Sequence, residues 1–193
     1  MGQILAIDDW VKGLTEIPRQ EFTIPRVEEF THSTWIRPET LKPYLYYAKS
    51  HYTRNLIFKC DLFEIIAICW EVGQVSAVHN HRDQNCWMAV PIGKLRVQNF
   101  RVEGRDPKTG TCHLTPSDAY DMDPQHPGTV RPEQPVHQVL NLAEFKQPAT
   151  SIHIYSYPYA SCEMYSVDRG TYSDVPLHYT SEYGKLNPDE KLF

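Results

Sequence analysis

Short segments with the pattern of β-strands follow one another from about residue 55 onwards, and this succession limits the fold more than any other feature. Residues 62–70 are almost all apolar, as in a strand buried on both faces, whereas residues 94–103 alternate between polar and apolar side chains. Residues 104–110 are typical of a hairpin turn or loop. Further strand patterns cover residues 56–60, 136–140 and 150–155. Many short strands with turns between them predict a mainly β fold, a sandwich or a barrel.

The first 50 residues differ in character. Residues 4–14 carry apolar side chains near helical spacing, and residues 38–50 are also helical in pattern, with a proline at their start. We therefore expect one domain over residues 1–193. Its parts are a small N-terminal helical segment (about 1–50), a β-barrel (about 51–184) and a loosely held tail (185–193).

Composition excludes several classes of protein. The chain has 41% hydrophobic and 22% charged residues, and no apolar run approaches the roughly 20 residues that span a bilayer. Its net charge is -5 without a lysine or arginine cluster, which disfavours nucleic acid as a partner. Five cysteines form no CxxC pair, and the N-terminus lacks a secretory signal pattern. We expect a cytoplasmic protein that binds neither membrane nor nucleic acid.

The stretch 73–93 contains the strongest local signal for chemistry. His79 and His81 are two positions apart, so on a strand both imidazoles project from the same face, as in a metal site. A polar turn at residues 82–85 separates this strand from a second one, and glycines bracket the whole stretch. A pair of this kind is also found as one exposed and one hydrogen-bonded histidine, so this alternative stays open at this point.

The spacing Gly-x5-His-x-His-x4-Cys-x6-Gly resembles the first conserved box of the cupin superfamily, with Cys86 where most cupins carry a glutamate ligand. His137 opens a His-x3-Asn sequence that resembles the end of the second box. Pro132 stands five residues ahead as in that box, although Gln134 replaces the usual glycine. The resemblance implies a jelly-roll β-barrel that holds a metal ion on three histidines, namely His79, His81 and His137.

Apart from His153, which is described below, the other histidines have no partner pattern. His126 lies in Pro-Gln-His-Pro-Gly, which is typical of a solvated turn. We expect the remaining four at the surface or in packing positions, namely His32, His51, His113 and His178.

From about residue 41 to 184 the chain is similar to one family within that superfamily, the cysteine dioxygenases. The histidine pair followed by Cys86 resembles the family's ligand pair and cross-linking cysteine, and Tyr52-Thr-Arg54-Asn-Leu resembles its motif for the substrate carboxylate. The resemblance also implies a tryptophan behind the site and a cysteine near its mouth, at Trp70 and Cys162.

Ser151-Ile-His153-Ile-Tyr155 resembles the Ser-His-Tyr triad of the same family. The three side chains alternate along a strand and face one side, so a hydrogen-bonded relay from serine to phenol is sterically natural. Alternatively, His153 is only a core histidine that forms hydrogen bonds with the same two neighbours. The two interpretations share one structure and differ in whether Tyr155 points at the metal. In the family this tyrosine forms a thioether bond to the cysteine, so the resemblance implies a Cys86–Tyr155 cross-link.

The resemblance implies a cofactor, substrates and a reaction. One Fe(II) per chain would promote addition of both atoms of O2 to the sulfur of L-cysteine, giving 3-sulfinoalanine. Three neutral imidazoles without a carboxylate leave the charge of the metal to be offset by an anionic ligand such as a thiolate. Zinc also fits three histidines but has no redox chemistry, so iron comes from the resemblance.

Arg54 bears on the choice of substrate. Its guanidinium can bind a carboxylate as a fork, with Tyr52 steadying it, or it can be a surface cation whose stem covers the core. Relatives that oxidise 3-mercaptopropionate tend to carry glutamine there, so Arg54 favours L-cysteine. The alternatives are a dioxygenase for another small thiol and a non-catalytic metal-binding cupin. A monomer is expected.

The sequence departs from the family after Tyr155. The family has Ser-Pro-Pro with a cis peptide, whereas this chain has Ser156-Tyr157-Pro158-Tyr159. A cis bond before a residue other than proline costs about 3 to 4 kcal/mol. We therefore expect a trans peptide between Ser156 and Tyr157, or a loop that carries its backbone strain at Tyr157–Pro158 instead.

Overall fold

The computed structural model describes residues 2–131 and 133–192, so the Pro132 element of the second-box pattern lies outside the described residues. The helices are α1 (Ile7–Thr15) and α2 (Ile24–Ser33), with short 3-10 turns η1 (Arg19–Glu21), η2 (Pro38–Tyr44) and η3 (Ala143–Phe145). The strands are β1 (Gln3–Leu5), β2 (Thr34–Ile36), β3 (Thr53–Lys59), β4 (Glu64–Trp70), β5 (Val78–His79), β6 (Asn85–Ile92), β7 (Leu95–Asp106), β8 (Thr111–Met122), β9 (Gly128–Val130), β10 (Val136–Leu140), β11 (Ala149–Ser156), β12 (Ser161–Ser166), β13 (Thr171–Pro176), β14 (Ser181–Glu182) and β15 (Lys185–Leu186).

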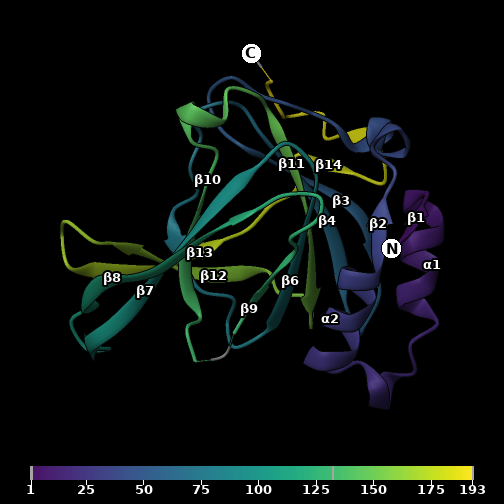
Figure 1. Ribbon diagram of the computed structural model, residues 1–193. Coiled ribbons are helices and arrows are strands. Elements are labelled where there is room, and N and C mark those ends of the chain that lie inside the picture. Colours follow the sequence, from purple (N-terminus) through teal and green to yellow (C-terminus); the bar gives the residue numbers. More distant parts are fainter. Residues whose placement is uncertain (1, 132, 193) are drawn as a thin grey trace.

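The described β-structure consists of a small parallel pair, β1 and β2, and two large groups of strands, which confirms the prediction of a mainly β fold with a β-barrel. Strands β10-β5-β12-β13-β8-β7 close on themselves as a barrel, and β15-β14-β3-β4-β11-β6-β9 form a seven-stranded sheet. Figure 1 shows α1 and α2 on one side of the molecule, next to β3 and β4, while the β7–β8 hairpin extends away on the opposite side. The expected hairpin around residues 104–110 is confirmed, with its strands reaching Asp106 and Thr111.

The seven-stranded sheet is buried on both faces, which explains the continuous apolar run in β4. Ile65 and Ala67 pack with Trp10 and Leu14 of α1 in a core between the helices and the sheet. Side chains from the other face of the sheet pack against the barrel in a second core, and these include Leu56, Ile66, Ile68, Trp70, Cys86, Met88 and Tyr155. Because side chains alternate along a strand, Ile66, Ile68 and Trp70 of β4 face this second core, while Ile65 and Ala67 face the helices.

The N-terminal region contains helices, but not where the sequence pattern placed all of them. Residues 3–5 pair with β2 as a parallel strand before α1 begins, and the predicted helix over 38–50 is wrong beyond Tyr44. Pro43 inside η2 lacks a backbone N–H, so a regular α-helix cannot continue through it. Helix α2 was not expected; Pro25 lies in its first turn, where a missing N–H costs no helical hydrogen bond.

The peptide bond between Ser156 and Tyr157 is cis, so the expectation of a trans bond there is wrong. Hydrogen bonds hold the chain on both sides of it. The Ser156 hydroxyl donates to the Leu62 carbonyl at 2.9 Å, and the Tyr157 N–H donates to Oε1 of Gln84 at 2.6 Å. These contacts, which link segments far apart in the sequence, were not readable from the local residues.

The end of the chain is partly ordered by pairing. Strand β14 pairs in parallel with β3, and β15, at the start of the region predicted as a tail, pairs with β14.

Within the described residues, no helix has the length and hydrophobicity that crossing a membrane requires.

Candidate metal centre and active site

Three histidines from two segments of the chain meet at one point. His79 ends β5 and pairs with His137 on the adjacent strand β10, and His81 follows just before the turn at Arg82 and Asp83. One nitrogen from each of the three imidazoles lies within 4.8 Å of the others. His79 Nε2 and His81 Nε2 are 3.3 Å apart, and His137 Nε2 is buried without a partner among the described residues. This is the arrangement that a metal ion bound by three nitrogens would need.

Backbone carbonyls orient two of these rings. Nδ1 of His79 lies 2.9 Å from the Ala77 carbonyl, and Nδ1 of His137 lies 3.3 Å from the Pro135 carbonyl. Since a carbonyl only accepts, both Nδ1 atoms carry the proton and leave the Nε2 lone pairs free, as in metal-binding histidines. Burial lowers the pKa of His79 to about 4, and burial with neighbouring histidine charges holds the pKa of His81 and His137 well below the ordinary value. The three imidazoles are therefore neutral at pH 7, which is the ligating form.

A chain of hydrogen bonds runs along the inner face of β11. Trp70 Nε1–H donates to Ser151 Oγ at 2.9 Å, Ser151 Oγ lies 2.8 Å from His153 Nε2, and His153 Nδ1 lies 3.0 Å from the Tyr155 hydroxyl. Because the indole can only donate, full pairing assigns the serine proton to His153 Nε2 and the imidazole proton to the Tyr155 oxygen. The Tyr155 hydroxyl proton is then not used within this chain of hydrogen bonds. The Tyr155 ring meets the His81 ring edge to face, with centroids 5.0 Å apart.

Cys86 and Tyr155 are directly opposite each other on the antiparallel strands β6 and β11. Side chains at opposed positions lie on the same face of a sheet, with Cβ atoms about 4.5 to 5.5 Å apart. Both side chains are buried, and burial raises the pKa of each well above its ordinary value. The sheet therefore brings a thiol and a phenol together beside the three histidines.

Arg54 projects from β3, and its Nε is buried with no partner in the described part of the chain. Burial opposes its charge, but the phenols of Tyr155, Tyr159 and Tyr52 outweigh burial and raise the pKa of the guanidinium. The Tyr52 ring stacks on Trp70 with centroids 4.6 Å apart. A buried cation that forms no ion pair within 4 Å among the described residues thus lies near the phenols of the site.

Comparison with known proteins decides the family. The model of the family described as cysteine dioxygenase type I matches residues 8–168 of the chain. The chain belongs to the cysteine dioxygenase type I family. Cysteine dioxygenase type 1 of Danio rerio is 25% identical over 186 residues, which cover 95% of this chain and 90% of that protein. The human protein of the same name is 22% identical over 170 residues, which cover 88% and 82%.

A solved structure with a similar fold is TT1209 from Thermus thermophilus. It is 17% identical, with a TM-score of 0.45 over 61% of this chain and 93% of that one. A protein with a double-stranded β-helix domain from Klebsiella pneumoniae has a TM-score of 0.43, with 14% identity over 65% and 94%.

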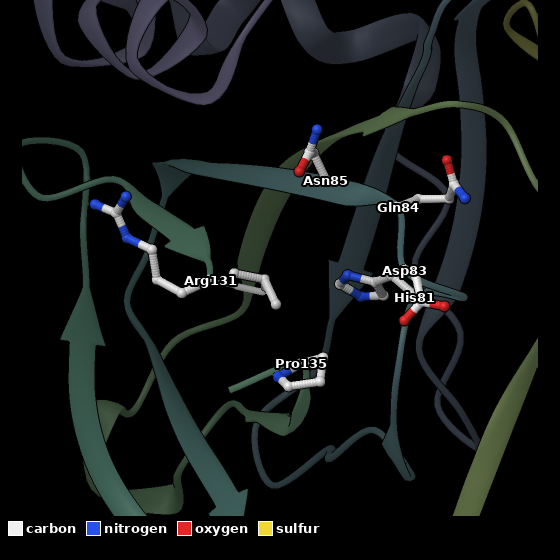
Figure 2. A pocket seen from close by; sticks show the side chains of 7 residues that line it. His81, Asp83, Gln84, Asn85, Arg131 and Pro135 are labelled. Atoms are coloured by element: carbon white, nitrogen blue, oxygen red, sulfur yellow. The ribbon is translucent and has the colours of Figure 1, made fainter. Parts of the chain in front are cut away.

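Two cavities of this cysteine dioxygenase family member are lined by residues of the site or by their strand neighbours. One cavity is lined by Tyr52 and Arg54 together with Met164, whose strand position pairs with His79. Figure 2 shows the other, with His81 facing it and the exposed guanidinium of Arg131 turned away. Cys162 is buried on β12, and burial raises the pKa of its thiol while the Arg54 charge opposes that shift.

Sequence reasoning missed Tyr159 as a neighbour of the site. Its ring centroid lies 5.1 Å from that of Tyr155 and 6.1 Å from that of His81. The only available signal was its place in the loop directly after the triad strand. The histidines without a partner pattern are exposed as expected, namely His32, His51, His113, His126 and His178; His126 pairs with Asp123 at 2.8 Å.

Proposed function

We propose that the protein is an Fe(II)-dependent cysteine dioxygenase, which adds both atoms of O2 to the sulfur of L-cysteine and gives 3-sulfinoalanine. The observation that carries this proposal is the convergence of three neutral imidazoles beside the paired Cys86 and Tyr155, in a chain of this family. His79, His81 and His137 are the proposed ligands of one iron ion per chain.

The donor set fits such an ion. Two ligands have their Nδ1–H groups anchored to backbone carbonyls, and the buried, unpartnered Nε2 of His137 would gain a partner. Without a carboxylate ligand, the site would keep a net positive charge and favour an anionic sulfur ligand. Fe(II), when bound, supplies the open coordination positions and the redox chemistry for a thiol and O2. Zinc matches the ligand count but not that chemistry.

Arg54 is the proposed partner of the substrate carboxylate, with Tyr52 beside it. The guanidinium offers a planar set of donors that matches a carboxylate in two places, and its Nε has no partner among the described residues. The cavity lined by both residues opens next to the strand that pairs with His79, which gives L-cysteine a route to the proposed metal. Trp70, stacked on Tyr52, would form the back of the site and Cys162 would lie near its mouth.

Tyr155 is the proposed catalytic phenol, held in place by Ser151 and His153. Since His153 Nδ1–H satisfies the Tyr155 oxygen, the hydroxyl proton of Tyr155 can be donated towards the substrate. We also propose a thioether bond between Cys86 and Tyr155. Its formation joins the sulfur to a ring carbon in place of the S–H and ring C–H bonds, and one O2 accepts the two protons and two electrons as H2O2.

Three further proposals concern the protein as a whole. The five cysteines are all free in the structure, which supports a reducing, cytoplasmic environment. We propose that the protein acts as a monomer and as one domain with the N-terminal segment (about 1–50), barrel (about 51–184) and tail (185–193) described above.

The test is O2 consumption by protein loaded with Fe(II) under anaerobic conditions, with L-cysteine and separately with 3-mercaptopropionate, and with products identified by mass. The proposal expects the sulfinate of cysteine, lost in His79→Ala. Consumption of 3-mercaptopropionate alone would refute the argument from Arg54 and leave the metal site standing. Bound metal without thiol-dependent O2 uptake would instead favour a non-catalytic binding protein.

A further inference from the structure

Asn80 stands between the two histidines of the ligand pair but faces the other way. In the ladder between β5 and β12, His79 is opposite Met164, and one step further the Asn80 N–H donates to the Glu163 carbonyl at 3.2 Å. Because side chains alternate along extended chain, the histidines face the interior while Asn80 meets the side chain of Glu163 on the opposite face.

The side-chain amide of Asn80 binds Glu163 twice, once at its carboxylate and once at its backbone N–H. The Asn80 Nδ2 donates to Oε2 of Glu163 at 2.7 Å, and the Glu163 N–H donates to Oδ1 of Asn80 at 3.2 Å. The hydroxyl of Tyr165 donates to the same carboxylate oxygen at 2.9 Å. The carboxylate thus holds the residue that links the two proposed ligands.

Arg105 fixes this carboxylate from the β7–β8 hairpin, which extends from the barrel in Figure 1. Its Nη1 donates to Oε2 of Glu163 at 3.0 Å and its Nη2 pairs with Oε1, so the contact is two-pronged. The guanidinium also lies over the Tyr172 ring, 4.2 Å from its centroid, and its Nε donates to the Tyr172 hydroxyl at 2.9 Å. Only 12% of the Glu163 side chain is exposed, whereas 38% of the Arg105 side chain is, so the carboxylate is the shielded member of this pair.

The segment that carries the proposed ligands is short and leads into a turn, although β5 pairs with β10 and β12 and Arg82 pairs with Asp174. Strand β5 is two residues long, His81 lies beyond it, and Arg82 and Asp83 follow with positive φ angles of 54° and 60°. If such a segment is mobile in the metal-free protein, ordering it costs free energy when the metal binds. If the protein has already ordered the segment, this cost is avoided and the metal binds more tightly.

We propose that Glu163, held by Arg105, is a positioning residue that fixes the segment 79–81 in the geometry that binds the metal ion. This inference rests on the metal site of the proposed function and adds the device that orders two of its ligands. Neither Glu163 nor Arg105 touches the substrate or the metal in this account.

The test is the dissociation constant for Co(II), measured by competition with a chelating dye on the folded full-length protein. We expect Glu163→Ala to weaken Co(II) binding by about tenfold, in line with the loss of groups that orient metal ligands. Glu163→Gln keeps an oxygen for Asn80 but loses the charge that Arg105 binds. Its Co(II) dissociation constant should therefore lie between those of Glu163→Ala and the natural protein. The Co(II) absorption spectrum should change in Glu163→Ala and largely recover in Glu163→Gln.

Glu103→Gln is the matched control, because Glu103 pairs with Arg101 at 3.9 Å on the same hairpin but is exposed. It should bind Co(II) within about twofold of the natural protein. A merely structural role for Glu163 would lower the urea midpoint of the metal-free protein but leave Co(II) affinity and spectrum unchanged, and that result would overturn the inference alone. If Glu163→Ala does not fold, the same criteria apply to Glu163→Gln. Failure of the natural protein to bind Co(II) would overturn the proposed metal site as well.

Discussion

Replacing Arg54 by glutamine tests how the protein selects its substrate. In the proposed complex the guanidinium pairs with a buried carboxylate, and loss of one partner of such a pair costs about 2 to 5 kcal/mol. This corresponds to a roughly 30- to 5000-fold fall in kcat/KM for L-cysteine. Cysteamine has the thiol and the amine but no carboxylate, so its kcat/KM should change by less than about fivefold.

The stability of the same variant gives an independent check. Nε of Arg54 is buried without a partner in the described residues, so the free protein gains little from this charge. We expect the free energy of unfolding of Arg54→Gln to equal or exceed that of the natural protein, as measured by urea denaturation. Arg82→Gln is the control, because it removes one positive charge as Arg54→Gln does. Arg82 pairs with Asp174 and its side chain is 40% exposed, so this variant should lose little activity. Equal losses with L-cysteine and cysteamine would refute the carboxylate role.

Three more predictions concern the triad and the cross-link. Ser151→Ala leaves Trp70 Nε1 and His153 Nε2 without a partner, so it should cost about 1 to 3 kcal/mol of unfolding free energy in urea titrations; an unchanged midpoint would contradict the hydrogen-bond chain. Burial lowers the pKa of His153 to about 3, below its unfolded value, so the stability from this group is full above pH 6.5 and falls as the pH drops towards 3, by about 1.4 kcal/mol per pH unit. The three ligand histidines, whose pKa values are also lowered, add to the pH dependence of the metal-free protein. Urea unfolding at several pH values should therefore give a slope that is smaller by about 1.4 kcal/mol per pH unit in His153→Gln than in the natural protein. After turnover, intact mass should reveal protein lighter by two hydrogens, with Cys86 and Tyr155 in one cross-linked peptide; Cys86→Ser should lack this species, and its persistence there would rule out this pairing.

Much of the β-structure follows from local pattern. The prediction of a strand over 136–140 agrees with β10 residue for residue, and 150–155 lies within β11. Alternation also predicts that His79 and His81 share a face and that Ser151, His153 and Tyr155 share another. These relations depend only on the two-residue period of a strand, so no distant contact is needed to predict them.

Other features depend on contacts that no local pattern contains. The cis peptide at Ser156–Tyr157 is flanked by hydrogen bonds that Ser156 and Tyr157 donate to Leu62 and Gln84, which are distant in sequence. The packing of Tyr159 against Tyr155 is likewise a contact that the local pattern does not contain. Similarly, the link from Arg105 to Asn80 through Glu163 joins three strands, so it became visible only with the fold.

The central claim is that both atoms of one O2 molecule reach the sulfur of L-cysteine. The most direct test is a reaction of the Fe(II)-loaded protein with L-cysteine under 18O2 in ordinary water, followed by mass spectrometry of the product. The account predicts 3-sulfinoalanine with both sulfinate oxygens labelled and consumption of one O2 per product. A product with one labelled oxygen, or disulfide with no labelled sulfinate, would contradict the assignment as a dioxygenase.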